Sequence, residues 1–316
     1  MTKNVMKLQY FILLMLIVFA GKLLAQTPLS CDEIAYAYPI NSITIDGDIS
    51  DWPKDIARYS IDNVYGNKLK NREDFNAYFQ VAYNLSEQSL YFAIVVSDDS
   101  HIIDTTQNAD WDTQDTYSLY LDSKHLLTGS GVVAYQFNEK WKKLLNPADS
   151  WDPEVKNANW DNVQVASKHQ GSKTIYECRL VLKKQLFPGR SIGVDHVIID
   201  KDADNGKGVR SYISWGRNQG KDNSPGKLGY VILMKADEST GTIAGQIKWK
   251  NDSIKGFPGN IRITSANNPA LWVQTTVDST GRYSVMLPAG RYTVSPVWSF
   301  WGMNDNLYKI DRKRSS

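Results

Sequence analysis

The stretch that decides the fold runs from Ala77 to Asp99 and reads AYFQVAYNLSEQSLYFAIVVSDD. Every second residue from Ala77 to Tyr83 is apolar, which is the period of a strand with one buried face. The polar segment 84–89 is typical of a turn. The apolar, β-branched run at 90–96 then indicates a second, more deeply buried strand. The stretch therefore predicts a β-hairpin.

Further short apolar segments, separated by turn residues, follow this hairpin while helical periodicity is scarce. Many short strands of this kind favour an all-β fold with an N-terminal antiparallel β-sandwich, jelly-roll-like in outline. The expected strands are 116–121, 132–137, 163–166, 175–181, 192–199, 212–215 and 228–233.

The pattern resets at the polar run 235–240, where we expect a domain boundary. Gly281 and Gly290 lie in two turn segments beyond it and can supply a positive φ. The sequence predicts a small C-terminal β-sandwich of the prealbumin or immunoglobulin type. Its expected strands are 241–249, 261–265, 271–276, 283–287 and 292–295.

The first 25 residues have the features of a secretory signal peptide. Lysines precede an apolar run at 11–20, and the small residue Ala25 suits a cleavage site. An uncleaved anchor is the alternative. The predicted organisation is therefore a signal peptide at 1–25, a sandwich at 26–236 and a second sandwich at 237–316. We expect export to the periplasm, the cell surface or the medium, with no membrane span after signal removal.

Composition narrows the choice of partner. Loss of Lys3, Lys7 and Lys22 with the signal takes the 36 basic residues to 33, against 34 acidic residues, a net charge of −1. No strong field of one sign then remains to attract nucleic acid or anionic lipid. Cys31 and Cys178 are the two cysteines. In an oxidising compartment they can form a disulfide, and the alternative for Cys178 is a buried thiol in a strand.

Two tryptophans lie beside polar loops, each next to an expected strand. Trp111 precedes the strand at 116–121, and Trp215 ends the segment 212–215. A sugar ring buries its C–H face on an indole while polar side chains bind its hydroxyls. We therefore expect a carbohydrate site. Its predicted residues are Trp111, Trp215, Asp112, Gln114, Arg217 and Asn218.

Acidic residues alternate before a glycine in the segment 200–208. The carboxylates of Asp200, Asp202 and Asp204 have a spacing that can wrap oxygen ligands around Ca²⁺. A structural calcium site is one expectation here, and a solvated acidic turn is the alternative. Asp98, Asp99 and Asp104 form a second acidic cluster.

Catalytic motifs are absent from the sequence. It contains four histidines and no H-E-x-x-H helix, G-x-S-x-G elbow or phosphate-binding loop. We expect no catalysis within these residues. If the chain is part of an enzyme, the expected activity is that of a glycoside-acting hydrolase.

Three segments, ITIDGDISDWP at 43–53, LYFAIVVSD at 90–98 and LYLD at 119–122, occur in an order that resembles the family 9 carbohydrate-binding modules. In that family two tryptophans from separate loops hold a sugar, and Trp111 and Trp215 occupy the matching positions. Ser118 stands where the family often has a glutamate, which places the usual sugar preference in doubt. The further landmarks are Trp111 with Asp115, Asp202 to Asp204, Arg210, Trp215, Pro225 and Gly229.

The C-terminal region, 241–296, resembles the carboxypeptidase-regulatory-like, transthyretin-like modules of secreted proteins. The matching segments are GQI at 245–247, DSTGRY at 278–283 and LPAGRYTV at 287–294. Such modules imply a spacer or contact role without catalysis. The Trp-rich end beyond Val297 offers no clear closing strand. Either the last strand is weak, or the chain stops short of a longer natural product.

Three functions follow as hypotheses. The first is a secreted, non-catalytic protein that binds a polysaccharide or oligosaccharide and serves carbohydrate catabolism. The second is the binding portion of a larger polysaccharide-degrading hydrolase. The third is a surface adhesion or structural protein without a sugar site.

Overall fold

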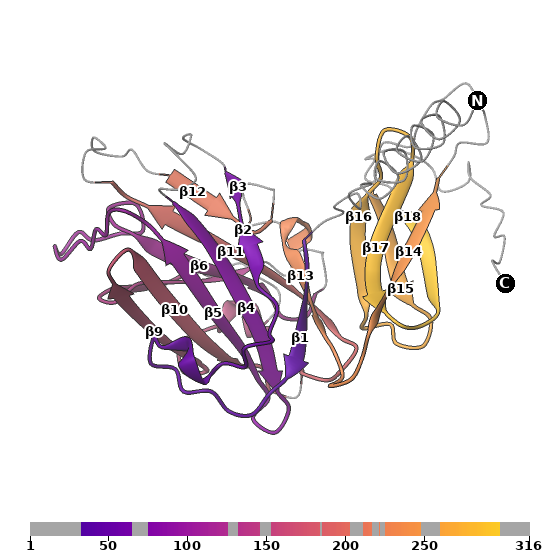
Figure 1. The fold of residues 1–316 in the computed structure, drawn as a ribbon, viewed down its shortest axis with the longest axis horizontal. Coiled ribbons are helices and arrows are strands. Elements are labelled where there is room, and N and C mark those ends of the chain that lie inside the picture. Colours follow the sequence, from indigo (N-terminus) through magenta and orange to yellow (C-terminus); the bar gives the residue numbers. More distant parts are fainter. Residues whose placement is uncertain are drawn as a thin grey trace, which may run out of the picture.

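The computed structural model describes residues 33–64, 75–125, 132–145, 153–183, 185–202, 211–216, 221, 225–247 and 260–297. Strands dominate this part of the chain, which confirms the all-β prediction (Figure 1). A larger sandwich lies on the left of the view and a smaller one on the right. Within the described ranges, no helix has the length and apolarity that a bilayer crossing requires.

Thirteen strands form one curled sheet whose halves face each other. One half holds β8, β7, β6, β11 and β13, with β12 and β3 attached. The other holds β4, β5, β10 and β9, with β2 attached. The bounds are β2 Tyr59–Ile61, β3 Asn63–Val64, β4 Asn76–Asn84, β5 Ser89–Ser97, β6 Thr116–Asp122, β7 Val133–Phe137, β8 Lys142–Leu145, β9 Val163–Gln170, β10 Lys173–Val181, β11 Ser191–Asp200, β12 Ser211–Ser214 and β13 Gly229–Leu233.

The first described strand, β1 (Ile34–Pro39), joins the two halves, and the sequence did not predict it. Its beginning pairs in parallel with β13, and its end pairs in parallel with β4. The other strand pairs of the sandwich are antiparallel among the described residues, as predicted. The two ends of the sandwich sequence therefore lie side by side.

The predicted hairpin is β4 and β5, paired from Asn76↔Ser97 to Asn84↔Ser89. Nearly every residue of β5 is buried, because both of its faces are covered. One face belongs to the core between the halves. The other packs on Ile43, Ile45 and Trp52, which come from the segment before β2. Double coverage explains why this strand reads as a continuous apolar run.

The buried carboxylate of Glu177 ties that preceding segment to β10. It accepts hydrogen bonds from Asp46 N at 3.0 Å, Gly47 N at 2.7 Å and Trp52 Nε1 at 2.8 Å. Three donors compensate a buried charge that would otherwise be costly. Trp52 is therefore a structural residue beneath the first turn.

The C-terminal region forms two small sheets, β14–β17 and β16–β15–β18, which confirms the predicted second sandwich. The turn before β17 needs Gly281, with φ +82, because a Cβ there would lie 2.1 Å from Ile247 O. Gly290 is not among the positive-φ glycines, so that part of the turn prediction was wrong. The strands are β14 Thr240–Gln246, β15 Asn260–Ser265, β16 Trp272–Thr276, β17 Arg282–Pro288 and β18 Tyr292–Val297.

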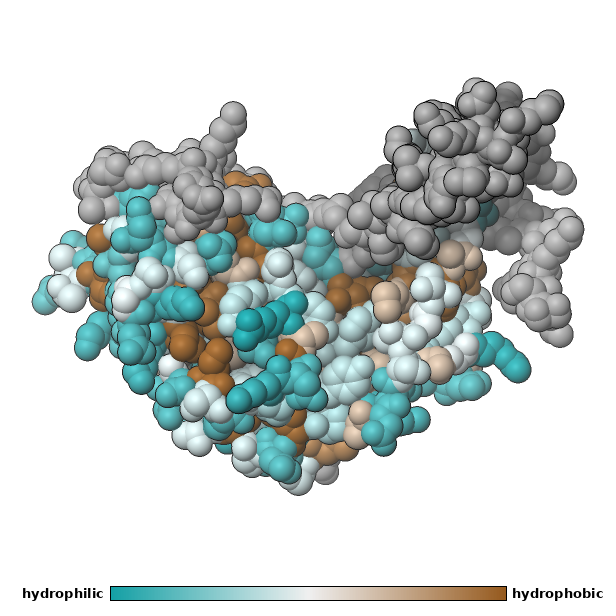
Figure 2. All heavy atoms as spheres, in the orientation of Figure 1, coloured by the Kyte–Doolittle hydropathy of each residue, from teal (hydrophilic) through white to brown (hydrophobic). Residues whose placement is uncertain are grey.

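The two sandwiches share an apolar cluster. Tyr230 and Ile232 of β13 pack with Ile263, Val273 and Leu287 of the smaller one. At the same junction the buried imidazole of His125 stacks on Trp272, with ring centroids 3.7 Å apart. On the face shown in Figure 2, hydrophilic residues predominate among the coloured atoms and hydrophobic residues form small patches between them.

Candidate functional site

The loop between β5 and β6 carries Trp111 and is fastened by Asp115. One oxygen of this carboxylate accepts a hydrogen bond from Ile102 N at 2.8 Å, and the other accepts one from Lys201 N at 2.7 Å. Lys143 of β8 pairs with Asp110 at 2.8 Å on the other side of the loop. These contacts fix the backbone on both sides of Trp111, so the indole is presented on an ordered loop.

Trp111 is half-buried on the outward face of the first half-sheet. It packs against the cluster that contains Tyr120 and Val197, beside Tyr212 of β12. The rings of Trp111 and Tyr212 lie 6.3 Å apart at an interplanar angle of 42°. Sequence reasoning missed Tyr212, although its place opposite Ile199 follows once the register of β11 and β12 is known.

Trp215 does not lie on that surface. Its side chain is only 4% exposed and belongs to the core between the half-sheets. The indole meets Phe79 edge-on at 4.9 Å, and it fills the space above Gly229, where a Cβ would come within 2.6 Å of the ring. An indole enclosed in this way offers no face to a sugar. The expectation that a sugar stacks on Trp215 is therefore wrong.

The reason lies in the strand period. Ile213 and Trp215 are two residues apart and both point inward, and Trp215 N donates to His196 O at 3.0 Å as a continuation of the ladder. Alternation thus runs one residue beyond β12. The polar residues after Trp215 made it resemble a loop residue.

The polar residues predicted to bind the sugar hydroxyls lie in different environments. Gln114 is fully buried, and its Oε1 accepts hydrogen bonds from Asn138 Nδ2 at 2.7 Å and Asp104 N at 3.2 Å. It therefore holds the loop together instead of facing a ligand, which corrects its predicted role. Asp112 is half-buried next to Trp111. Arg217 and Asn218 lie outside the described residues.

The segment after Trp215 is anchored by a buried ion pair. Lys221 Nζ contacts the carboxylate of Asp195 and donates to Gly216 O at 2.8 Å, and Gly216 N donates to Asp195 Oδ1 at 2.9 Å. Burial disfavours both charges, so it raises the pKa of Asp195 and lowers that of Lys221, while their mutual attraction opposes both shifts. The two ends of the segment 216–221 are therefore held together.

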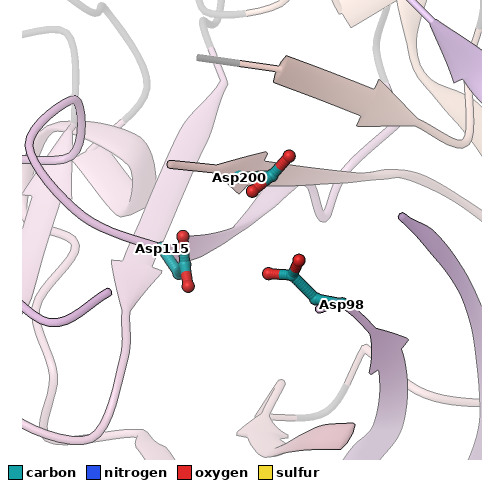
Figure 3. A group of neighbouring side chains, drawn as sticks. All are labelled: Asp98, Asp115 and Asp200. Carbon is teal, nitrogen blue, oxygen red and sulfur yellow. The ribbon is translucent and has the colours of Figure 1, made fainter. Parts of the chain in front are cut away.

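Three carboxylates converge at one end of the larger sandwich (Figure 3). They belong to Asp98 after β5, Asp115 before β6 and Asp200 at the end of β11, and their ligand atoms lie within 4.8 Å of one another. Of the predicted metal residues, Asp200 is a member of this group. Asp202 is buried but is not one of the three, and Asp204 lies outside the described residues.

The electrostatics of this group favour a cation. Burial, together with the negative charge of Asp115, raises the pKa of Asp98 to about 7. His101 lies 3.4 Å from Asp115 Oδ2 and 3.2 Å from Glu139 Oε2, and these carboxylates raise its pKa. Clustered carboxylate oxygens are the hard donors that suit Ca²⁺. The residues present therefore fit a calcium ion.

Sequence reasoning had placed Asp98 and Asp200 in two separate acidic clusters. The pairing of Thr116 with Ile199 sets Asp115, before β6, beside Asp200 at the end of β11. Asp98, after β5 of the other half-sheet, brings its carboxylate to the same two residues. Cys178 is a fully buried free thiol whose pKa is raised by burial, whereas Cys31 lies outside the described residues.

Comparisons with known proteins agree with this architecture. The sequence model of the family described as carbohydrate family 9 binding domain-like matches residues 45–236. Two solved structures of a family 9 carbohydrate-binding module from Caldicellulosiruptor kristjanssonii, one with cellotriose and one with glucose, are similar in fold at 17% identity and a TM-score of 0.52. They cover 64% of this chain, which spans 94% and 96% of theirs. No curated protein matches the chain.

Proposed function

Because the chain belongs to the carbohydrate family 9 binding domain-like family, we propose that its larger sandwich binds a saccharide without catalysis, on the surface formed by Trp111 and Tyr212. The observation that carries this proposal is the pair of half-buried aromatic rings, 6.3 Å apart, on an outward sheet face.

The aromatic pair suits one face of a sugar ring. Axial C–H groups pack on the indole, and the tilted phenol ring borders the same surface. Asp112, next to Trp111 in the chain, supplies a carboxylate for hydroxyl groups. Arg217 and Asn218, which lie outside the described residues, are further proposed polar partners on the strength of the sequence alone.

The proposed ligand is a glucose-based oligosaccharide. This choice is supported by the two structures of similar fold, whose complexes contain cellotriose and glucose. Ser118 is buried and accepts a hydrogen bond from Gln136 Nε2 at 3.0 Å, so it supplies no carboxylate to the ligand. We therefore propose that this chain relies on aromatic contact more than on a charge at that position.

Calorimetric titration of the mature chain with cellotriose tests the proposal. Trp111→Ala is expected to weaken binding by at least about 2 kcal/mol, as for an aromatic anchor, and Tyr212→Ala by less. Phe187→Ala is the matched control, since Phe187 is an exposed aromatic residue in the connection between β10 and β11. Unchanged affinity in Trp111→Ala would reject the surface.

Trp215→Phe distinguishes this surface from the two-tryptophan arrangement. It keeps an aromatic ring in the core, so a folded variant is expected to bind as the wild type does. Loss of binding in a Trp215→Phe protein with an unchanged fold would instead restore Trp215 to the site.

We further propose a structural Ca²⁺ ion held by Asp98, Asp115 and Asp200. Asp115 also fastens the Trp111 loop through Ile102 N, so a cation here would order the proposed binding surface. Titration of chelator-treated protein with Ca²⁺, followed by thermal unfolding, tests the site. An unfolding temperature that does not respond to Ca²⁺ would contradict it.

Export and the role of the smaller sandwich complete the proposal. Cleavage after Ala25 is expected, and sequencing the N-terminus of the mature protein from the host tests it. The resemblance of 241–296 to carboxypeptidase-regulatory-like modules supports a spacer or contact role. The apolar cluster shared with β13 supports a fixed spacer over a loosely tethered one.

A further inference from the structure

An exposed ion pair borders Trp111 on the outward face of the first half-sheet. Lys143 Nζ lies 2.8 Å from Asp110 Oδ1 and 3.0 Å from Asp110 Oδ2. Both side chains remain accessible, with 36% of the Lys143 side chain and 41% of the Asp110 side chain exposed. Exposed ion pairs contribute little to stability, because water and salt screen them. The two charged groups can therefore exchange contacts with water for contacts with a ligand.

The alternation of β8 places Lys143 on the same face as Trp111. Leu144 packs against the core between the half-sheets, whereas Leu145 packs in the outward cluster together with Trp111 and Tyr212. Side chains two residues apart share a face of a strand, so Lys143 points outward with Leu145. The ammonium group therefore lies on the β8 side of the aromatic surface, toward the opposite edge of the half-sheet from Tyr212.

The carboxylate of Asp110 is held against the main chain of Trp111. Its Oδ1 accepts a hydrogen bond from Trp111 N at 2.8 Å, so the carboxylate lies beside any sugar ring that stacks on the indole. Partial burial acts to raise the pKa of Asp110, but the hydrogen bonds from Lys143 and from Trp111 N lower it overall. The carboxylate is therefore ionised at neutral pH, and the ion pair carries no net charge.

The pair keeps a donor and an acceptor for a ligand. An ammonium group has three N–H donors, and among the described residues the ammonium group of Lys143 bonds to Asp110 alone. Asp110 Oδ2 accepts from Lys143 and has a further lone pair. Adjacent equatorial hydroxyl oxygens of a pyranose lie about 3 Å apart, which is the length of a hydrogen bond. A donor and an acceptor at that spacing match two adjacent hydroxyl groups.

We propose that Asp110 and Lys143 set the saccharide specificity of the Trp111 surface by binding two adjacent hydroxyl groups of the stacked sugar. This inference rests on the saccharide surface proposed above. The ammonium group of Lys143 donates to one hydroxyl oxygen, and the neighbouring hydroxyl group donates to Asp110 Oδ2. The preferred ligand is a neutral pyranose with a free vicinal diol. A uronate gains no advantage over it, because the pair has no net charge.

Chemical-shift titration of the full mature chain with methyl β-glucoside and its 2-, 3- and 4-deoxy forms tests the inference. The 3-deoxy form, together with the 2-deoxy or the 4-deoxy form, should bind the wild type about tenfold more weakly than the parent glucoside, since each loses one hydrogen bond to a charged group. Lys143→Met should remove the penalty of one of these two sugars. Asp110→Asn keeps an acceptor for Trp111 N and should reduce the penalty of the other.

Lys142→Met is the matched control. Lys142 is exposed, precedes Lys143 in β8 and lies over the ring of Trp160 at 5.4 Å, so its side chain points to the opposite face of the strand. Losing the same charge there should leave every affinity unchanged. Circular dichroism and the unfolding temperature verify that each variant folds.

The outcomes separate this inference from the surface on which it rests. If Lys143 only steadies the loop, Lys143→Met weakens all four glucosides by the same factor and keeps the deoxy penalties, which would overturn the inference and leave the surface standing. A wild type that binds cellotriose but none of the glucosides would also overturn it. A wild type that binds no cellotriose would reject the surface and the inference together.

Discussion

Trp111 and Trp215 share a similar sequence setting and lie in opposite environments. Each stands beside polar residues at the border of a strand, yet Trp111 is half-buried on an outer sheet face and Trp215 is enclosed in the core. The difference comes from strand alternation. Trp215 stays in phase with Ile213, whereas Trp111 lies in a loop that Asp115 fastens. The polarity of neighbouring residues therefore identifies a loop less reliably than the inward–outward alternation of the strand does.

The most severe test of this contrast is Trp215→Ala. Removing a fully packed indole leaves a cavity next to Phe79 and Gly229, so the free energy of unfolding should fall by about 3–5 kcal/mol. Chemical denaturation followed by circular dichroism measures it. A loss below about 1 kcal/mol, the scale of surface substitutions, would mean that Trp215 is not a core residue.

The ion pair next to Trp215 should have the next largest effect. Lys221→Met removes the cation and leaves the carboxylate of Asp195 buried without it, which should cost roughly 3 kcal/mol at neutral pH. The double variant Asp195→Asn/Lys221→Met is the control, because it removes both charges and should recover part of that loss. If the single and double variants are equally stable, the pair does not hold the segment 216–221.

Much of the fold was predictable, because the alternating hairpin and the run of short strands carry their own signal. The strand β1 was not, since its parallel partners β13 and β4 lie far away in sequence. The candidate site was harder to predict from the sequence than the fold was. Trp111 has a local signal, but Tyr212 reaches it only through the register of β11 with β12. Likewise, Asp98 and Asp200 come together only in the folded sandwich, because they follow β5 and end β11 in opposite half-sheets.

Ca²⁺ binding should change the surroundings of Trp111 more than those of Trp215, because the proposed ion lies on the Trp111 side. At a free concentration about 100 times its dissociation constant, Ca²⁺ should stabilise the protein by about 2.7 kcal/mol. Asp115→Asn should abolish this gain. Fluorescence of a Trp215→Phe variant, in which Trp111 is retained, should respond to Ca²⁺, and that of Trp111→Phe should respond less. An equal response from both would remove the link between the ion and the Trp111 loop.

The carboxylates of Asp98, Asp115 and Asp200 also predict that the stability of the metal-free protein depends on pH. Since the pKa of Asp98 rises to about 7 on folding, the folded state binds the proton more tightly than the unfolded state. The stability should therefore fall as the pH rises from about 4 to about 7. Asp98→Asn should flatten this slope, which unfolding curves recorded across the range would show. A slope that is identical in Asp98→Asn would assign it to other groups.

The smallest expected change in stability belongs to Trp111→Ala. Its ring is half-buried on an outer face and leaves no enclosed cavity, so the free energy of unfolding should fall by about 1 kcal/mol or less. Its affinity for cellotriose should nevertheless fall below detection, because a weak saccharide complex at roughly −4 kcal/mol cannot lose an anchor and persist. Denaturation and calorimetry on one preparation measure both quantities. A stability loss as large as that of Trp215→Ala, with binding retained, would mean that Trp111 is also a core residue and that the saccharide binds elsewhere.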